Sequence, residues 1–245
     1  MAIRNQKFID EVNEELFNQF FTVQELNNFE SLYLISELNQ DNKNFKELLK
    51  KDLKTKKKAV FIASNPDDYE YMDKTAKEYA KYFKKLGLSE FQKIDNRMTN
   101  FAAINHIGSA DLVFLMGGNP VTQLDFIKAK KIDELITGFK GTIIGLSAGA
   151  MNLGKKVFWS KDEDIEESLT YEGLGVVDIT VDAHFRTDDK TKVQEFLKCE
   201  LEAIGLPDES FIRVDKYGIK TIYGTYYIKE NDKLVEKNDN VEDIS

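Results

Sequence analysis

Four short runs of apolar residues stand out along the chain, each bounded by polar residues or by turns that contain glycine. They cover residues 31–35, 59–63, 111–116 and 142–146 and are rich in Val, Ile, Leu or Phe. Runs of this kind are typical of strands that are buried on both faces of a parallel sheet. The pattern therefore predicts four parallel strands.

Segments that mix polar and apolar residues over the length of a helix lie beside and between these runs. They cover residues 44–53, 67–86, 102–108 and 122–139. Strands that alternate with helices favour a doubly wound sheet, because each helix covers one face and leads to the next parallel strand. The predicted fold class is therefore α/β, with a doubly wound, mostly parallel sheet.

The pattern changes after residue 150. We expect a strand at residues 176–181 and a helix at 191–204. Short β segments then alternate with turns from residue 210 to 235, which predicts a C-terminal β-hairpin region. No shift in composition marks a second domain, so we predict that residues 29–245 form a single α/β domain.

The first 28 residues carry a different pattern. Phe8, Val12 and Leu16 recur at helical spacing, which predicts an amphipathic helical extension over residues 1–28. This segment could pack on the domain that follows it or on a second subunit. A homodimer is therefore one arrangement that the sequence leaves open.

Charge and composition narrow the choice of partner and compartment. The chain has 34 basic and 43 acidic residues and a net charge of −9, which argues against nucleic acid and anionic membranes as partners. It contains one cysteine, so an internal disulfide framework is excluded. The N-terminus lacks the apolar segment of a signal peptide, and no apolar run approaches the ~18 residues of a membrane span. We expect a cytoplasmic protein.

The most specific motif is the Gly-x-Ser-x-Gly pattern in residues 145–150, with Ser147 at its centre. A predicted strand precedes it and small residues follow it, as a sharp strand-to-helix turn requires. Such a turn lifts the serine hydroxyl above the sheet and places it near a helix N-terminus, where developing negative charge is stabilised. Ser147 is therefore predicted to be a nucleophile.

A serine nucleophile needs a base, and the chain contains only two histidines, His106 and His184. His184 follows the strand expected at 176–181, at the edge of an α/β sheet where catalytic groups collect. His106 falls inside a predicted helix and is expected to be structural. We therefore predict that His184 is the base.

An acid must orient this base. An acidic cluster lies between Ser147 and His184 in the chain, and position alone does not select among its members, which are Asp162, Glu163, Asp164 and Glu166. Asp182 is less suited, because it lies on the same extended strand as the histidine.

An acyl-transfer site also needs N–H donors for the oxyanion of its tetrahedral intermediate. The backbone N–H of Ala148 follows the nucleophile directly. The pair Gly117 and Gly118 comes after the strand expected at 111–116, where glycine lets the backbone turn an N–H toward the site. Asn119 is next to this pair, and we expect it to bind the substrate.

Three of these motifs together resemble peptidase family S51, which contains the aspartyl dipeptidases (peptidase E) and the cyanophycinases. They are residues 114–119, 145–150 and 182–185, and the likeness extends over roughly residues 30–230. The spacing from serine to histidine is similar to that of the dipeptidase branch. The resemblance implies a sheet like that of the class I glutamine amidotransferases, which is flavodoxin-like.

The resemblance also implies roles for individual residues. Carried over position by position, Ser147 is the nucleophile, His184 the base and Asp162 the acid, while Gly118 and Ala148 supply the oxyanion donors. The dipeptidases of this family cleave after an N-terminal aspartate and need neither a metal nor a cofactor. The function implied is thus a serine peptidase that acts on small peptides, with dipeptides that begin with an acidic residue as its substrates.

The chain departs from the family pattern in one respect. The dipeptidases carry an arginine shortly before the acid, where this chain has Phe158 or its neighbours. Arg186, which is close to the predicted base, is our candidate for holding a substrate carboxylate, because an arginine binds carboxylates in a bidentate fork.

Two other functions stay open at this point. A serine esterase of the α/β-hydrolase type is one, but only 37 residues separate Ser147 from His184, which leaves little room for the strand–helix units that this fold usually places before its histidine. A non-catalytic binding protein on a peptidase-like scaffold is the other. A glutamine amidotransferase is disfavoured, because its nucleophile is cysteine and Cys199 lies far downstream of the motif.

Overall fold

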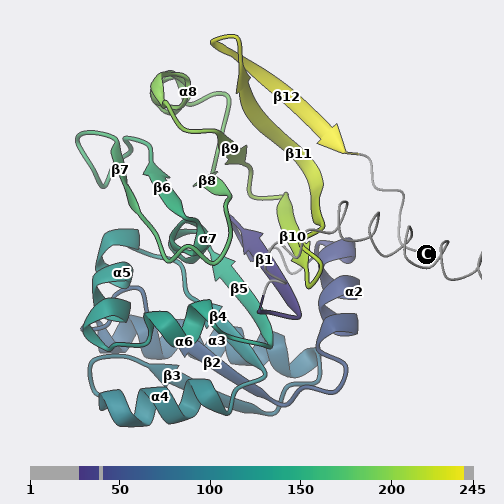
Figure 1. Cartoon of the computed structure of the whole chain (residues 1–245), viewed down its shortest axis with the longest axis vertical. Helices are drawn as coiled ribbons and strands as arrows, with labels where there is room; N and C mark the ends of the chain where they lie inside the picture. The colour runs from purple at the N-terminus through teal and green to yellow at the C-terminus, as the bar shows by residue number, and fades with distance from the viewer. Residues whose placement is uncertain (1–27, 39–40, 240–245) are drawn as a thin grey trace, which may run out of the picture.

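The computed structural model describes residues 28–38 and 41–239, and its central feature is a long mixed β-sheet (Figure 1). The strands of this sheet lie in the order β3-β2-β4-β5-β1-β10-β11-β9-β8, and β12 pairs with β11. Their bounds are β1 Ser31–Ile35, β2 Lys58–Ile62, β3 Glu90–Ile94, β4 Leu112–Leu115, β5 Thr142–Leu146, β8 Thr180–Ala183, β9 Ala203–Leu206, β10 Phe211–Asp215, β11 Lys220–Glu230 and β12 Lys233–Asp239.

The sheet has a parallel part and a largely antiparallel part. Strands β3, β2, β4, β5 and β1 all pair in parallel, whereas β10 and β11 continue the sheet in antiparallel fashion. At the far edge, β8 and β9 form another parallel pair. A small antiparallel hairpin of β6 (Lys156–Trp159) and β7 (Leu169–Glu172) lies apart from the main sheet.

Helices cover both faces of the parallel part, as the alternating burial of β1 illustrates. Leu32 and Leu34 pack into one core with α4, α5, α6 and α7, while Tyr33 and Ile35 face a second core with α2 and α3. The helices are α2 Lys43–Asp52, α3 Tyr69–Lys85, α4 Asn100–Gly108, α5 Pro120–Ala129, α6 Asp133–Thr137, α7 Ala148–Leu153 and α8 Lys190–Lys198.

The predicted α/β class with a mostly parallel, mixed sheet and flanking helices is confirmed. The four strands expected from the apolar runs are β1, β2, β4 and β5, each within one residue of its expected ends. The finer likeness to the flavodoxin-like amidotransferase sheet stays a prediction. The helical extension expected at residues 1–28 lies, apart from Asn28, outside the described residues, and the single-domain assignment stays a prediction.

Several expected elements were wrong in their extent. The helix expected at 122–139 is two helices, α5 and α6, which are separated where Lys131 takes a φ of 57°. The helix expected at 191–204 ends at Lys198, and the apolar residues after it form β9. The strand expected at 176–181 begins only at Thr180.

The sequence did not predict β3 or the β6–β7 hairpin. Strand β3 lies at the edge of the sheet and most of its residues are exposed or half-buried, so it has no apolar run. The acidic cluster at 162–167 belongs to the connection within the β6–β7 hairpin. None of the helices in the described part of the chain is long and apolar enough to cross a membrane.

Candidate active site

Ser147 lies in the tight turn between β5 and α7, in an unusual backbone conformation. Its φ is 49° and its ψ is −108°, which non-glycine residues rarely adopt. Its N–H donates a hydrogen bond of 2.8 Å to the carbonyl of Ile35, at the end of β1. The turn and the neighbouring strand therefore hold the serine above the carboxyl edge of the sheet.

The glycines around Ser147 are required by the close packing of α7 on the sheet. A Cβ on Gly149 would lie 2.4 Å from the carbonyl oxygen of Leu115 on β4. A Cβ on Gly145 would lie 2.6 Å from the backbone nitrogen of Ala150. Larger residues at these positions would push the helix away from the strands, and the turn would not place the serine where it lies.

His184 follows the last residue of β8, and its ring lies between two side chains. Its Nε2 is 2.9 Å from Oγ of Ser147. Its Nδ1 is 2.6 Å from Oδ1 of Asp208. The side chains of His184 and Asp208 are each somewhat less than half exposed, so the chain of hydrogen bonds Ser147–His184–Asp208 is open to a substrate.

Asp208 reaches His184 because β8 and β9 are parallel neighbours. Ala183 pairs with Leu206, so the residues that follow these two strands emerge at the same edge of the sheet. Pro207 then turns the chain before Asp208. The acid therefore comes after the histidine in the sequence, in the order Ser, His, Asp.

Asp162, the acid expected from the resemblance, contacts other groups. Its Oδ2 accepts a hydrogen bond of 2.8 Å from the indole Nε1 of Trp159. Its Oδ1 accepts from the backbone N–H groups of Asp164, at 2.8 Å, and Ile165, at 3.2 Å. Asp162 thus orders the turn between β6 and β7, while the position next to Nδ1 of His184 is taken by Asp208.

Gly118, one of the two expected oxyanion donors, lines the same cavity as Ser147, and Ala148, the other, follows Ser147 in the chain. Ala148 is the first residue of α7, directly after Ser147. Gly118 has a φ of +143°, and a Cβ there would lie 2.2 Å from Oγ of Ser64, so only glycine fits. The Ser64 hydroxyl donates a hydrogen bond to the carbonyl of Gly117, which fixes this turn against the end of β2.

The two expected substrate-binding residues both line the cavity above Ser147. The side chain of Asn119 caps helix α5, where its Oδ1 accepts from the N–H of Thr122 at 2.9 Å. Arg186 is mostly exposed, and its nearest ion-pair contact is a long one of 3.8 Å to Asp188. The Arg186 guanidinium therefore keeps most of its donors available to a ligand.

The cavity has a volume of about 1030 Å³ and is walled by residues at and after the carboxyl ends of β8 and β9, by the turns after β4 and β5, and by the β6–β7 hairpin. Its charged lining combines Lys161, Arg186 and Lys192 with acidic residues, which include Asp182 and the carboxylates of the 162–164 turn. Among residues 28–38 and 41–239 no group of three or more His, Cys, Asp or Glu side chains is arranged to hold a metal ion.

Asp182 is a buried carboxylate at the base of this cavity. Its Oδ1 accepts a hydrogen bond of 2.9 Å from Ser160 and lies 3.4 Å from Nζ of Lys192, while its Oδ2 has no hydrogen-bond partner. Burial raises the pKa of Asp182 to about 6, against the opposing effect of the Lys192 ammonium. Ionisation of this carboxylate is therefore coupled to a neighbouring buried cation.

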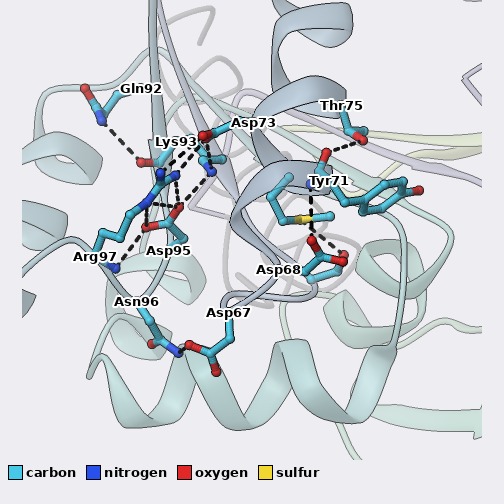
Figure 2. A network of polar contacts seen from close by, with 12 residues as sticks. Asp67, Asp68, Tyr71, Asp73, Thr75, Gln92, Lys93, Asp95, Asn96 and Arg97 are labelled. Carbon is cyan, nitrogen blue, oxygen red and sulfur yellow. Dashed lines mark hydrogen bonds and ion pairs between the residues drawn. The ribbon is translucent and has the colours of Figure 1, made fainter.

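A network of ion pairs lies where β3 ends against α3 (Figure 2). Lys93 and Arg97 both contact Asp73 and Asp95, at 2.6 to 2.7 Å. The hydrogen bonds from Arg97, and then those from Lys93, hold the pKa of Asp73 well below its usual range. The network ties the end of β3 to the first turns of α3.

Asn96, which follows β3, holds the loop that carries Ser64 by two hydrogen bonds. Asn96 donates from its side chain to Asp67 at 2.6 Å and from its backbone to the carbonyl of Pro66 at 3.2 Å (Figure 2). The loop after β2 is thus fixed on one side by β3 and contacts Gly117 on the other. The turn at Gly117 and Gly118 is consequently supported by residues that no motif in the sequence indicates.

Sequence reasoning missed Asp208 because it looked for the acid in the acidic cluster between Ser147 and His184, and because it placed residues 191–204 in a helix. The signal that could have found it is the apolar segment before Pro207. Read as a strand, this segment puts Asp208 at a carboxyl strand end, as with His184. His106, in contrast, lies on α4, and it does not line the cavity.

Comparisons with known proteins find a matching family model and solved structures with a similar fold. The chain matches the model of peptidase family S51 over residues 32–222. No curated protein matches it. A crystal structure of a peptidase from an acI-B1 Actinobacterium has a TM-score of 0.64 at 16% identity, over 86% of this chain and 94% of that one. A candidate peptidase E from Listeria monocytogenes EGD-e has a TM-score of 0.56 at 16% identity, over 85% and 98% of the two chains.

Proposed function

Because the chain belongs to peptidase family S51, we propose that it is a serine peptidase that hydrolyses small peptides through Ser147, His184 and Asp208. The observation that carries the proposal is the continuous pair of contacts Ser147 Oγ–His184 Nε2 and His184 Nδ1–Asp208 Oδ1 at the wall of one cavity. A nucleophile, a base and an orienting acid joined in this way are the recurring arrangement of acyl-transfer sites.

In the proposed reaction, Asp208 accepts the Nδ1–H of His184 and so leaves Nε2 unprotonated to act as base. Nε2 takes the proton of the Ser147 hydroxyl as its oxygen attacks the carbonyl carbon of the peptide. The backbone N–H groups of Gly118 and Ala148 are the proposed donors to the oxyanion that forms.

The intermediate then collapses. The amine leaves with a proton from Nε2 and the acyl group stays on Ser147 as an ester. His184 next takes a proton from water, the resulting hydroxide attacks the ester, and the acid product and free Ser147 are released. Neither step requires a metal or a cofactor.

We propose dipeptides with an N-terminal acidic residue as the substrates, in line with the dipeptidase branch that the sequence resembles. Arg186 is the proposed partner of the substrate carboxylate. It lines the cavity, and its contact with Asp188 is too long for a tight ion pair. A guanidinium with free donors can hold a carboxylate by two parallel hydrogen bonds.

A dipeptide library read by mass spectrometry tests this function. We expect the wild type to release free amino acids, fastest from dipeptides that begin with Asp, and Ser147→Ala to lose several orders of magnitude in kcat with an unchanged circular dichroism spectrum. Arg186→Ala should raise KM for the acidic dipeptides and leave their neutral counterparts unaffected. Equal turnover by wild type and Ser147→Ala would end the serine-peptidase proposal, and an unselective wild type would end the substrate proposal alone.

A further inference from the structure

The peptide unit that joins Ala183 to His184 is held at both of its polar ends by buried side chains from other parts of the chain. Its carbonyl oxygen, on Ala183, accepts a hydrogen bond of 2.7 Å from Nζ of Lys192 on α8. Its N–H, on His184, donates a hydrogen bond of 3.1 Å to Oγ of Ser36. Ser36 is fully buried and Lys192 is 7% exposed.

This peptide unit needs such support, because His184 has a φ of 54°, in the left-handed region. A non-glycine residue is strained there and keeps the conformation only where its surroundings over-determine it. The left-handed turn is what directs the imidazole from the end of β8 toward both Ser147 and Asp208. Loss of the conformation would withdraw the ring from one partner or the other.

Ser36 links this turn to the rest of the site. Its hydroxyl accepts from His184 and donates to the carbonyl of Leu206 at 2.7 Å, in the strand that leads to Asp208. The preceding carbonyl, on Ile35, accepts the N–H of Ser147. Two consecutive residues at the end of β1 thus contact the nucleophile, the base and the strand before the acid.

Lys192 is a buried cation whose charge is balanced by Asp182. Its ammonium lies 3.4 Å from Oδ1 of Asp182 and makes its shorter contact, a hydrogen bond, with the Ala183 carbonyl. A buried ion pair contributes little net stability, because desolvation offsets the attraction. What this pair does supply is a fixed donor against the peptide unit before the base.

We infer that Ser36 and Lys192 are positioning residues that clamp the peptide unit between Ala183 and His184, so that the His184 ring stays within hydrogen-bond distance of both Ser147 and Asp208. The inference rests on the proposed peptidase function for its kinetic consequence, but the clamp itself has a spectroscopic signature that is independent of turnover. Neither residue touches the reacting atoms.

The test uses the full chain, with Ser36→Ala and the double substitution Asp182→Asn/Lys192→Met. The double substitution removes the donor without leaving Asp182 as an unpaired buried charge. We expect kcat to fall about 10- to 100-fold in each, with KM within about twofold of wild type, because small displacements of a catalytic group carry penalties of this size. Ser31→Ala is the matched control, since Ser31, on β1, is a buried serine like Ser36 but bonds to Thr142, away from the site.

The signature is the proton between Nδ1 of His184 and Asp208, followed by ¹H NMR in the downfield region. Only two histidines are present, so a His106→Gln spectrum assigns the resonance. We expect it to broaden or shift in Ser36→Ala and in the double variant, and to persist in Ser31→Ala. An unchanged resonance together with wild-type kcat in Ser36→Ala would overturn the clamp, whether or not the double variant folds. Absence of hydrolysis by the wild type, with the resonance altered as expected, would instead count against the peptidase function.

Discussion

The two halves of the candidate site are built in opposite ways. The turn at Ser147 is specified by a short stretch of adjacent residues, in which small side chains let α7 pack tightly on β4 and β5. The edge at His184 is assembled from Ser36, Lys192 and Asp208, which belong to three separate segments of the chain. The turn at Ser147 can therefore be recognised from a local motif, whereas the positions of His184 and Asp208 depend on the pairing of strands.

The largest effect, a loss of kcat, should come from a substitution at the sheet edge that holds His184. In Asp208→Asn the amide can donate to Nδ1 and favours the wrong tautomer of His184, so we expect kcat to fall about 10³- to 10⁴-fold. Asp162→Asn keeps the His184 contact and should lose less than about tenfold, because its hydrogen bonds serve the β6–β7 turn. Steady-state kinetics of both variants on one dipeptide measures the two losses of kcat. A larger loss in Asp162→Asn than in Asp208→Asn would identify Asp162, the residue that the sequence suggested, as the acid.

A smaller effect, on the stability of the fold, is expected from a substitution beside the turn at Ser147. Gly149→Ala would bring a Cβ to 2.4 Å from the backbone of Leu115, so strand or helix must shift. We expect the free energy of unfolding to fall by about 1–3 kcal/mol, as is usual for overpacking, with a parallel loss of kcat. Gly108→Ala is the control, since its Cβ would meet nothing within 4 Å. Urea denaturation of both variants gives the comparison, and equal stabilities would show that the tight turn tolerates a larger residue.

The smallest effect is the contribution of Asp182 to the pH dependence of the free energy of unfolding. The pKa of Asp182 is about 6 in the folded protein and near 3.8 when it is unperturbed, so the folded state holds the proton more tightly. Its contribution to stability is therefore present below pH 4 and lost as the pH rises through 6. Asp182→Asn lacks this titration.

We expect the unfolding free energy of Asp182→Asn, relative to wild type, to rise between pH 4 and 6 and to level off above. Denaturant titrations at intervals of half a pH unit measure this difference. A difference that stays constant over the window would mean that Lys192 and Ser160 fully compensate the burial of the carboxylate. Ionisation of Asp182 beside Lys192 would then leave the free energy of unfolding unchanged.

The sequence predicted β1, β2, β4 and β5 of the parallel part of the sheet well, because these strands are buried on both faces and have continuous apolar runs. It failed where an element is half-exposed, as in β3, or where apolar residues after a helix belong to a strand, as in β9. The same limit applies to the site. Ser147 and His184 lie next to recognisable patterns, but the partner of His184 depends on the register of β8 against β9, which no local pattern contains.

Strand β1 illustrates what this topology means for the order of folding. It is the first described strand in the chain, yet it lies in the middle of the sheet, between β5 and β10. At a synthesis rate of about 5–20 residues per second, β10 follows β1 from the ribosome after roughly 10–35 s. Until then the end of β1 lacks its antiparallel neighbour, and β9 with Asp208 has only just emerged. A growing chain thus completes the turn at Ser147 well before Asp208 is made, and the contacts from Ser147 through His184 to Asp208 form only when nearly the whole described chain has been synthesised.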